Sequence, residues 1–410
     1  MFIKKLSLTL LLCCVSFATH AKKENKSETL HDFCSNLASK KYQGVEGLPN
    51  ILVMRGCAWM KAGIIDQESE GHFLSAARKG NGKPASPEWI QEFTKVGDIA
   101  FKEAETAEMN KNKKEAHKKY ELASHFFYMA RWPHMFSKES TEAFKKHVIA
   151  YRKAGAYLNP PIQELKVPYD GKTIVAHLRL PSSDKPLPLI VFSPGIDDWK
   201  GEMNDFINPM LKAGFATLVV DLPGTGESEY RLAPGSHKVF TAAINFIKKN
   251  PKINADKIGF YGLSGGGYFA TAMALTNPNV KASVNIGGPV HYSFTKQWLE
   301  ETPKSVYATI TRCAGLSDKK IGHDQVLKEM AKISLAEQGL VNPSTQKAPL
   351  LTINGEQDFI AHRGEYRFLD EKGINQDTLI FENDGHVAPA HFDIHIPFSI
   401  NWLKKKMMVR

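Results

Sequence analysis

Residues 258–268 read IGFYGLSGGGY, and this stretch decides the fold that the sequence predicts. The apolar run Ile258–Leu263 is typical of a buried strand, and the small residues of Tyr268–Ala274 favour a helix. Ser264 stands between them among glycines, because the sharp strand-to-helix turn of a nucleophile elbow is tight and strained. Such a turn exposes the serine hydroxyl at the carboxyl edge of a sheet, above a helix N-terminus that favours negative charge. We therefore interpret Ser264 as a nucleophile; a plain glycine-rich turn is the alternative.

Short apolar runs alternate with helical stretches on both sides of this elbow. The alternation predicts a mostly parallel sheet with helices on both faces. Together with the serine elbow, such a sheet favours the α/β-hydrolase fold. We expect a catalytic domain over residues 158–410, with an amphipathic helical insertion around 291–346 that contributes to a cap. The expected strands are Gln163–Pro168 and Thr173–Leu180, joined by a turn at Asp170-Gly171, and then Leu187–Phe192, Ala216–Val220, Ile258–Leu263, Ala282–Ile286, Leu350–Ile353 and Thr378–Phe381.

A serine nucleophile needs a base, and the base needs a carboxylate that orients it. Asp358 and His386 each follow one of the short apolar runs, so each stands just beyond a predicted strand. They also follow Ser264 in the chain order that this fold demands. We predict Ser264, Asp358 and His386 as the catalytic residues. Glu356 and Asp384 are the alternative acids.

An oxyanion hole needs two backbone N–H donors. We expect one from Gly265, directly after the nucleophile, and the other from the loop that follows the first parallel strand. Gly195 lets the backbone of this loop approach the substrate closely, and Ile196 or Asp197 then presents its N–H. A plain turn is the alternative interpretation of this loop. The residues that we expect to bind substrate are Gly195, Trp199 and Tyr268.

Two further patterns resemble known sites but lack essential parts. Residues 221–228 read DLPGTGES and look like a phosphate loop, but Glu229 stands where a dinucleotide fingerprint needs its third glycine. No Gly-Lys-Ser/Thr sequence follows either, so we interpret the segment as a loop beside the active site. His391 and His395 are four residues apart and close to His386 in the chain, yet no acid completes a compelling set of metal ligands. We predict neither a metal nor a cofactor.

The first 21 residues have the pattern of a secretory signal peptide. Lys4 and Lys5 precede the apolar stretch Leu6–Phe17, and residues 18–21 offer small side chains for cleavage. The apolar stretch is shorter than the roughly 20 residues that a membrane-spanning helix needs. We therefore predict a secreted or periplasmic protein whose mature chain has no integral membrane segment. An uncleaved anchor is the alternative.

Residues 22–157 are expected to form a separate helical domain. Trp89–Met109 and Lys113–Arg131 carry apolar residues at helical spacing, so each has an apolar face that must pack on something. We hypothesise that this domain forms a lid over Ser264 together with the insertion around 291–346, since pockets of this kind often lie between domains. Arg131 and Trp132, at the end of the second helix, are then candidates for the pocket edge, although core packing is the stronger expectation for Trp132.

Composition limits the class of protein further. The 410 residues are 42% hydrophobic and 23% charged, which fits a globular chain with a sizeable core. The net charge of +10 comes from scattered basic residues without a nucleic-acid motif, so we expect no nucleic-acid partner. Cys34 and Cys57 both lie in the helical region and could form a disulfide after export, which leaves Cys313 over. Three buried thiols are the equally weighted alternative.

Several motifs taken together resemble one α/β-hydrolase family. It contains the fermentation-respiration-switch esterases, 2,6-dihydroxypseudooxynicotine hydrolase and fungal pigment hydrolases that shorten polyketides. The resemblance implies a helical domain before the hydrolase domain, a pocket between the two, and often a homodimer. It also implies hydrolysis of esters or of C–C bonds next to ketones, with the catalytic residues at the positions predicted above. The motifs that carry it are residues 195–200, 221–228 and 262–268, and a helical signature over 120–127 and 130–133.

The main functional hypothesis is an exported serine hydrolase that cleaves a small-molecule carboxylic ester through an acyl-enzyme. A hydrolase of C–C bonds in β-diketone-like ketones uses the same three residues, so the motifs leave both reactions open. A regulatory or binding protein on a relic fold is the alternative from another class. An intact triad argues against it, because a pure binder has no need of a strained serine turn. The signal peptide favours a scavenging or detoxifying role over cytoplasmic metabolic switching.

Overall fold

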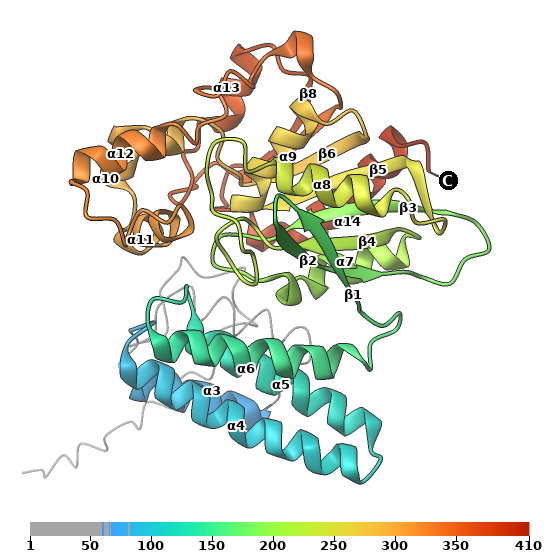
Figure 1. Ribbon diagram of the computed structural model, residues 1–410, viewed down its shortest axis with the longest axis vertical. Coiled ribbons are helices and arrows are strands. Elements are labelled where there is room, and N and C mark those ends of the chain that lie inside the picture. The colour runs from blue at the N-terminus through green and yellow to red at the C-terminus, as the bar shows by residue number, and fades with distance from the viewer. Residues whose placement is uncertain (1–59, 61–64, 66, 81–82, 410) are drawn as a thin grey trace, which may run out of the picture.

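The structure, a computed structural model, describes residues 60, 65, 67–80 and 83–409 (Figure 1). Its strands are β1 (Gln163–Tyr169), β2 (Lys172–Arg179), β3 (Leu187–Ser193), β4 (Ala216–Val220), β5 (Ile253–Leu263), β6 (Val280–Ile286), β7 (Leu350–Gly355) and β8 (Gln376–Phe381). They form an eight-stranded sheet in the order β1-β2-β4-β3-β5-β6-β7-β8. The β1–β2 and β2–β4 pairs are antiparallel and all other neighbouring pairs are parallel. The predicted α/β-hydrolase fold is confirmed.

Helices cover both faces of this sheet (Figure 1). One face packs against α7 (Asn204–Lys212) and α14 (Phe392–Lys406). The other packs against α8 (Lys238–Ile247), α9 (Gly265–Thr276) and α13 (Glu365–Glu371). The short 3₁₀ turns η1 (Lys200–Glu202) and η4 (Pro389–His391) lie in the loops before α7 and α14.

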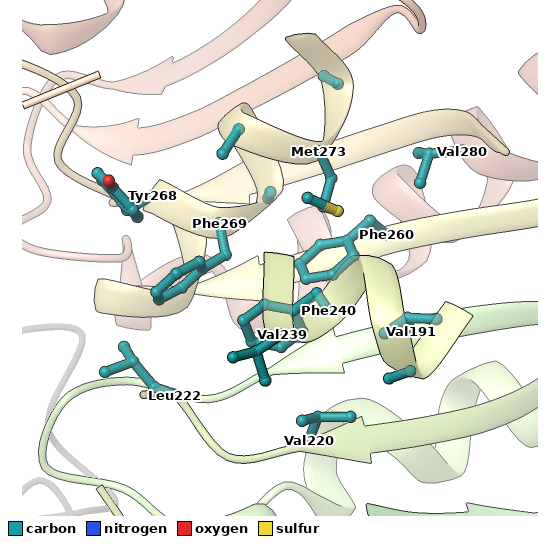
Figure 2. Close-up of a cluster of buried hydrophobic side chains, with 14 of the residues drawn as sticks. Val191, Val220, Leu222, Val239, Phe240, Phe260, Tyr268, Phe269, Met273 and Val280 are labelled. Atoms are coloured by element: carbon teal, nitrogen blue, oxygen red, sulfur yellow. The ribbon is translucent and has the colours of Figure 1, made fainter. Parts of the chain in front are cut away.

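The core is divided between the two faces because successive side chains along a strand point to opposite sides. In β5, Phe260 belongs to the cluster that α8 and α9 cover, whereas Tyr261 belongs to the cluster that α7 and α14 cover. Figure 2 shows the first cluster. In it, the ring centroid of Phe240 lies 5.2 Å from that of Phe260 and 4.8 Å from that of Phe269. Packing on both sides explains why the central strands are continuous apolar runs in the sequence.

Among the described residues, four helices precede the sheet, and they lie together to one side of it in Figure 1. They are α3 (Gln67–Lys79), α4 (Pro87–Met109), α5 (Lys113–Arg131) and α6 (Lys138–Gly155). The side chain of Ser86 caps α4 and a capping box at Ser137 begins α6, which fixes where these helices start. Every residue of α5 from Leu122 to Arg131 is buried, as expected for a helix with neighbours all round. The predicted helices Trp89–Met109 and Lys113–Arg131 are confirmed to within two residues.

The predicted insertion joins β6 to β7. It consists of η2 (Tyr292–Phe294), α10 (Lys296–Glu301), α11 (Lys304–Cys313), α12 (His323–Ala331) and η3 (Pro343–Thr345). In Figure 1 its helices α10, α11 and α12 stand out from one end of the sheet. In the described residues, no helix combines the length and the apolar character needed to cross a membrane.

Candidate active site

Ser264 lies at the turn between β5 and α9 in a left-handed backbone conformation, with φ 53° and ψ −123°. A non-glycine residue held in such a conformation costs about 1–3 kcal/mol and persists only where its surroundings impose it. A Cβ on Gly262 would collide with the Gly266 carbonyl, and a Cβ on Gly266 with the Ser193 carbonyl. The neighbouring glycines are therefore needed because the backbone of this elbow is packed against itself and against β3.

The structure brings the three predicted catalytic residues together in a hydrogen-bonded chain. Ser264 Oγ lies 2.7 Å from His386 Nε2, and His386 Nδ1 lies 2.8 Å from Asp358 Oδ2. The three residues come from the ends of β5, β7 and β8, which share one edge of the parallel sheet. The arrangement has the geometry of a nucleophile, a base and an orienting acid.

Asp358 is fixed by groups around it as well as by the imidazole. Its Oδ2 accepts from Asn354 Nδ2 at 2.8 Å, and its Oδ1 accepts from the backbone N–H groups of Ile360 and Ala361 at 2.8 and 3.1 Å. The side-chain oxygen of Asn354 in turn accepts from the Val387 N–H at 3.0 Å. Asn354 therefore ties the loop that carries the acid to the loop that carries the base.

The two alternative acids have other partners. Glu356 accepts from Tyr366 and from Arg367, which lie on α13. Asp384 lies 2.8 Å from His391 Nδ1. The structure therefore places Asp358, and neither alternative acid, against the imidazole of the predicted base.

The environment shifts the protonation of both members of this pair. Burial lowers the pKa of His386, but the charge of Asp358 and its hydrogen bond outweigh burial, so this pKa lies above its ordinary value. Burial raises the pKa of Asp358, but His386 and Asn354 together lower it more, so this pKa lies below its ordinary value. At neutral pH the acid is therefore ionised and the imidazole is a stronger base than a free histidine.

Two backbone N–H groups meet beside the serine. Gly265 is the first residue of α9, so its N–H lies outside the helical hydrogen-bond ladder. Ile196 N lies 3.3 Å from the place where a Cβ on Gly265 would stand, and its N–H has no protein acceptor in the described part of the chain. Asp197, the other predicted donor, presents its carbonyl to Arg131 and its carboxylate to Trp132. Ile196 is thus the loop residue whose N–H is adjacent to Gly265.

Ser264 and His386 line a pocket that opens to solvent and whose empty volume, open solvent included, is about 570 Å³. Apart from His386, no titratable side chain other than Tyr268 lines it among the described residues. The Tyr268 hydroxyl donates to the Ile333 carbonyl and accepts from Gln338, so it is already engaged. The other lining residues are Ile196, Leu222, Leu232, Gly265, Pro289, Ser293, Phe294, Trp298, Leu299, Thr302, Val306, Ile310, Ile360 and Ala361.

The predicted substrate-binding residues have three different places in the structure. Tyr268 lines the pocket through its ring. Gly195 does not line it, but a Cβ there would lie 3.3 Å from Ser264 Cβ and 2.9 Å from an Asp198 oxygen, so the loop can pass only as glycine. The prediction for Trp199 was wrong: its side chain is fully buried, 4.7 Å from His147 and 5.0 Å from Tyr151 between ring centroids. Its large apolar surface is used to attach α6 to the loop.

The helices α3–α6 also differ from the lid that the sequence predicted. Within the described residues they contribute nothing to the pocket lining, which the insertion helices α10 and α11 cover instead. Arg131 and Trp132 do not line the pocket, and both donate a hydrogen bond to Asp197. The apolar faces of α4 and α5 pack largely on one another, whereas Phe144, Val148 and Tyr151 of α6 pack on Trp199. Any part of residues 22–59 in a lid lies outside the described residues.

Sequence reasoning missed two groups of residues at this site. Asn354 was not singled out, although a polar residue at the end of an apolar strand beside the predicted acid is a usable signal. The apolar residues of the insertion, such as Trp298 and Val306, were expected to form a cap but were not named individually.

The described residues include the histidines considered as metal ligands and one of the three cysteines of the predicted mature chain. Among the described residues, no group of three or more His, Cys, Asp or Glu side chains is arranged to hold a metal ion. His391 stacks on Phe381 and bonds to Asp384. Cys313 is a buried free thiol. The predicted signal peptide and the pair Cys34 and Cys57 lie outside the described residues.

Comparison with known proteins gives relatives over most of the chain. Esterase FrsA of Vibrio vulnificus is 29% identical over 337 residues, which cover 79% of this chain and 77% of that protein. The 2,6-dihydropseudooxynicotine hydrolase of Paenarthrobacter nicotinovorans is 31% identical over 170 residues, or 41% of this chain and 46% of that protein. The crystal structure of 2,6-dihydroxy-pseudo-oxynicotine hydrolase superposes with a TM-score of 0.70 at 19% identity, covering 81% of this chain and 92% of that one.

The similarity to solved structures supports the fold, and the similarity in sequence also identifies the family. The sequence model of the family described as esterase FrsA-like matches residues 81–408. That range includes α4–α6, the whole sheet and all three residues of the hydrogen-bonded chain. The protein is therefore an α/β-hydrolase that belongs to the FrsA-like esterase family.

Proposed function

We propose that this hydrolase is an exported serine esterase that cleaves a small carboxylic ester through an acyl-enzyme. The observation that carries the proposal is the chain of short hydrogen bonds from Ser264 through His386 to Asp358 at the end of an apolar pocket. In this proposal Ser264 is the nucleophile, His386 the general base and Asp358 the acid that orients the imidazole.

The geometry supports a two-step reaction. Ser264 Oγ forms a bond to the ester carbonyl carbon while His386 Nε2 takes the hydroxyl proton, and the carbonyl oxygen becomes an anion that accepts from the Gly265 and Ile196 N–H groups. When this intermediate collapses, the bond to the leaving alkoxide breaks and His386 returns the proton to it. Water then attacks the acyl-enzyme by the same route and releases the acid.

The pocket supports an uncharged, apolar substrate. Apart from His386, the residues that line it in the described chain offer no charged side chain to pair with a substrate carboxylate or ammonium group. Ser293, one of its few polar residues, donates its hydroxyl to Glu365. An unpaired charge buried in this pocket would cost several kcal/mol of binding free energy, so we expect charged substrates to bind poorly.

A second candidate reaction is cleavage of a C–C bond next to a ketone. The likeness to 2,6-dihydropseudooxynicotine hydrolase supports it, and the same three residues would attack a ketone carbonyl in place of an ester. The export of the mature chain rests on the predicted signal peptide at residues 1–21.

The experiment uses the purified mature protein, p-nitrophenyl esters of increasing chain length and an uncharged β-diketone. We expect ester hydrolysis, and Ser264→Ala is expected to reduce it by several orders of magnitude while the fold persists. Ser293→Ala is the matched control, because this second serine of the pocket is engaged by Glu365. A fluorophosphonate should label the wild-type and Ser293→Ala proteins but not Ser264→Ala. Turnover by Ser264→Ala at the wild-type rate would exclude a serine mechanism, and turnover of the diketone alone would favour the second reaction.

A further inference from the structure

The loop over residues 195–202 carries four charged side chains that the proposed reaction does not use. They are Asp197, Asp198, Lys200 and Glu202. Asp198 and Lys200 are buried, and only 3% of the Glu202 side chain is exposed. Charged groups are rarely buried unless a partner compensates the loss of hydration. The same loop brings the Ile196 N–H beside Gly265, so whatever holds these charges also holds the proposed oxyanion hole.

The end of α5 holds the middle of this loop. Arg131 Nη1 donates to the Asp197 carbonyl at 2.9 Å, and Trp132 Nε1 donates to Asp197 Oδ2 at 2.9 Å. The Tyr128 hydroxyl donates to Asp198 Oδ1 at 3.0 Å. These contacts begin at the residue directly after Ile196.

The far end of the loop is held from two other sides. Lys200 Nζ lies 2.8 Å from Asp221 Oδ2 and 2.6 Å from Glu227 Oε2, in the loop that follows β4. His147 Nε2, on α6, lies 3.0 Å from Glu202 Oε1. The loop therefore has fixed ends, and the contacts from α5 determine how its middle approaches the serine.

Charge gives the α5 contacts a second effect. Asp197 and Asp198 are close enough to His386 to contribute to its raised pKa, so their negative charges also act on the place where the oxyanion would form. The negative charges of these aspartates would therefore repel the oxyanion. Arg131 is 2% exposed and its guanidinium lies 4.5 Å above the Tyr128 ring. Its Nη1 lies on the Asp197 carbonyl, so its charge offsets the negative charges of the loop, and it also helps to lower the pKa of the buried Glu202.

We propose that Arg131 and Trp132 are positioning residues for the oxyanion hole, which hold Asp197 so that the Ile196 N–H stays beside Gly265. The inference rests on the proposed serine mechanism. It gives the helical segment a role other than a lid: α5 supports the loop from behind while α10 and α11 cover the pocket. A displacement of about 1 Å in such a group is enough to slow a reaction substantially.

The test measures kcat and KM for a p-nitrophenyl ester on the full mature chain, with active sites counted by fluorophosphonate labelling. Arg131→Met keeps the length of the side chain but removes its donors and charge, and we expect kcat to fall about 10–100-fold with KM changed less than about threefold. Trp132→Phe removes only the N–H and should lower kcat about 5–10-fold by the same reasoning. Arg131→Lys, which keeps the charge and a donor, should recover part of the loss.

An inhibitor pair separates positioning from general damage. An alkyl boronic acid forms a tetrahedral anion on the serine, so its Ki should rise in the variants as kcat/KM falls. The primary amide with the same acyl chain forms no such anion, and its Ki should stay unchanged. Arg179→Met is the matched control, because Arg179 is also buried but donates to the Pro160 carbonyl and to Asn208, which are not part of the loop. It should lower the melting temperature but leave kcat per labelled site unchanged.

Three results would overturn the inference. These are an unchanged kcat per labelled site in Arg131→Met and Trp132→Phe, a loss confined to KM, or an equal loss of kcat in Arg179→Met. If the wild-type protein shows serine-dependent turnover and one of these three results is found, only the positioning role is overturned and the proposed function stands. Absence of serine-dependent turnover in the wild type overturns the proposed function and the inference together.

Discussion

At the scale of single residues, the acid of the site is distinguished by its surroundings rather than by its type. Asp358 receives hydrogen bonds from His386, Asn354 and two backbone N–H groups. Asp384 is occupied by His391 and Glu356 by residues of α13. A carboxylate with several donors stays ionised, which is the state needed to support a positively charged imidazole.

Asp358→Asn should therefore be far more damaging than Asp384→Asn. An amide at position 358 cannot support the imidazolium and favours the wrong tautomer, so kcat should fall about 10³–10⁴-fold. Asp384→Asn should change kcat only a few-fold, roughly, since it removes no contact to the base. Steady-state kinetics of both variants on one ester decide this, and the reverse ranking would assign the acid to Asp384.

The pH dependence of kcat/KM should reflect the raised pKa of His386. Below that pKa the imidazole is protonated and cannot take the Ser264 proton, so activity should fall as the pH is lowered, with a midpoint above 6.5. In Asp358→Asn burial is the largest remaining influence and lowers this pKa, while Asp197 and Asp198 still raise it, so the midpoint should move to lower pH. The same midpoint in both proteins would show that another group controls the acid limb.

At the scale of elements, the insertion between β6 and β7 shapes the pocket, and the described helices before the sheet, α3–α6, contribute no lining residue. α10 and α11 bring Trp298, Leu299, Val306 and Ile310 over the serine. Val306 and Ile310 are four residues apart and therefore lie on one face of α11, whereas Trp298 and Leu299 are neighbours on α10. The length of acyl chain that the site accepts should therefore depend on this insertion.

Val306→Trp should shorten the range of accepted esters. The larger side chain fills part of a pocket that Val306 lines, so kcat/KM should fall much more for an octanoate than for an acetate ester. We expect the ratio of kcat/KM for the octanoate ester to that for the acetate ester to fall roughly tenfold, because a few methylene contacts are lost. Tyr307→Trp on the same helix, which does not line the pocket, is the control. An unchanged octanoate-to-acetate ratio in Val306→Trp would place the acyl chain elsewhere.

At the scale of the whole molecule, the helical segment and the sheet meet around a single buried tryptophan. The indole of Trp199 lies among the rings of His147, Tyr151 and Phe144 from α6 and of His177 from β2. Several of these contacts are edge-to-face, the arrangement that aromatic rings favour. The contact attaches the helices to the same loop that carries the proposed oxyanion hole.

Trp199→Ala should lower the free energy of unfolding by about 3–5 kcal/mol, because it leaves a large cavity in this interface. Urea denaturation followed by circular dichroism measures the change. Trp298→Ala is the comparison: this tryptophan lines the pocket and is only half-buried, so its loss should cost less stability and alter the ester preference. Equal stability losses in the two variants would contradict the assignment of Trp199 to the interface.

Most of the sheet and the site was predictable because the relevant signals are local. The strands appear in the sequence as apolar runs since both faces of the sheet are covered, and Ser264, Asp358 and His386 stand just beyond the ends of such runs. Trp199 was misassigned because proximity in sequence to the oxyanion loop says nothing about which side of that loop a side chain faces. That α3–α6 contribute no residue to the pocket lining was not predictable, because an apolar helix face shows that a helix packs, but not on what.

By itself, the sequence determined that this chain has a strand, a strained serine turn and a helix in immediate succession, because those conformational preferences act between neighbours. It also determined the chain order of the three residues. Only the tertiary structure decided which carboxylate meets the imidazole and that α5 grips Asp197, since these contacts join residues 28 and 66 positions apart. Contacts over such separations depend on how whole elements pack, and no local pattern in the chain specifies that packing.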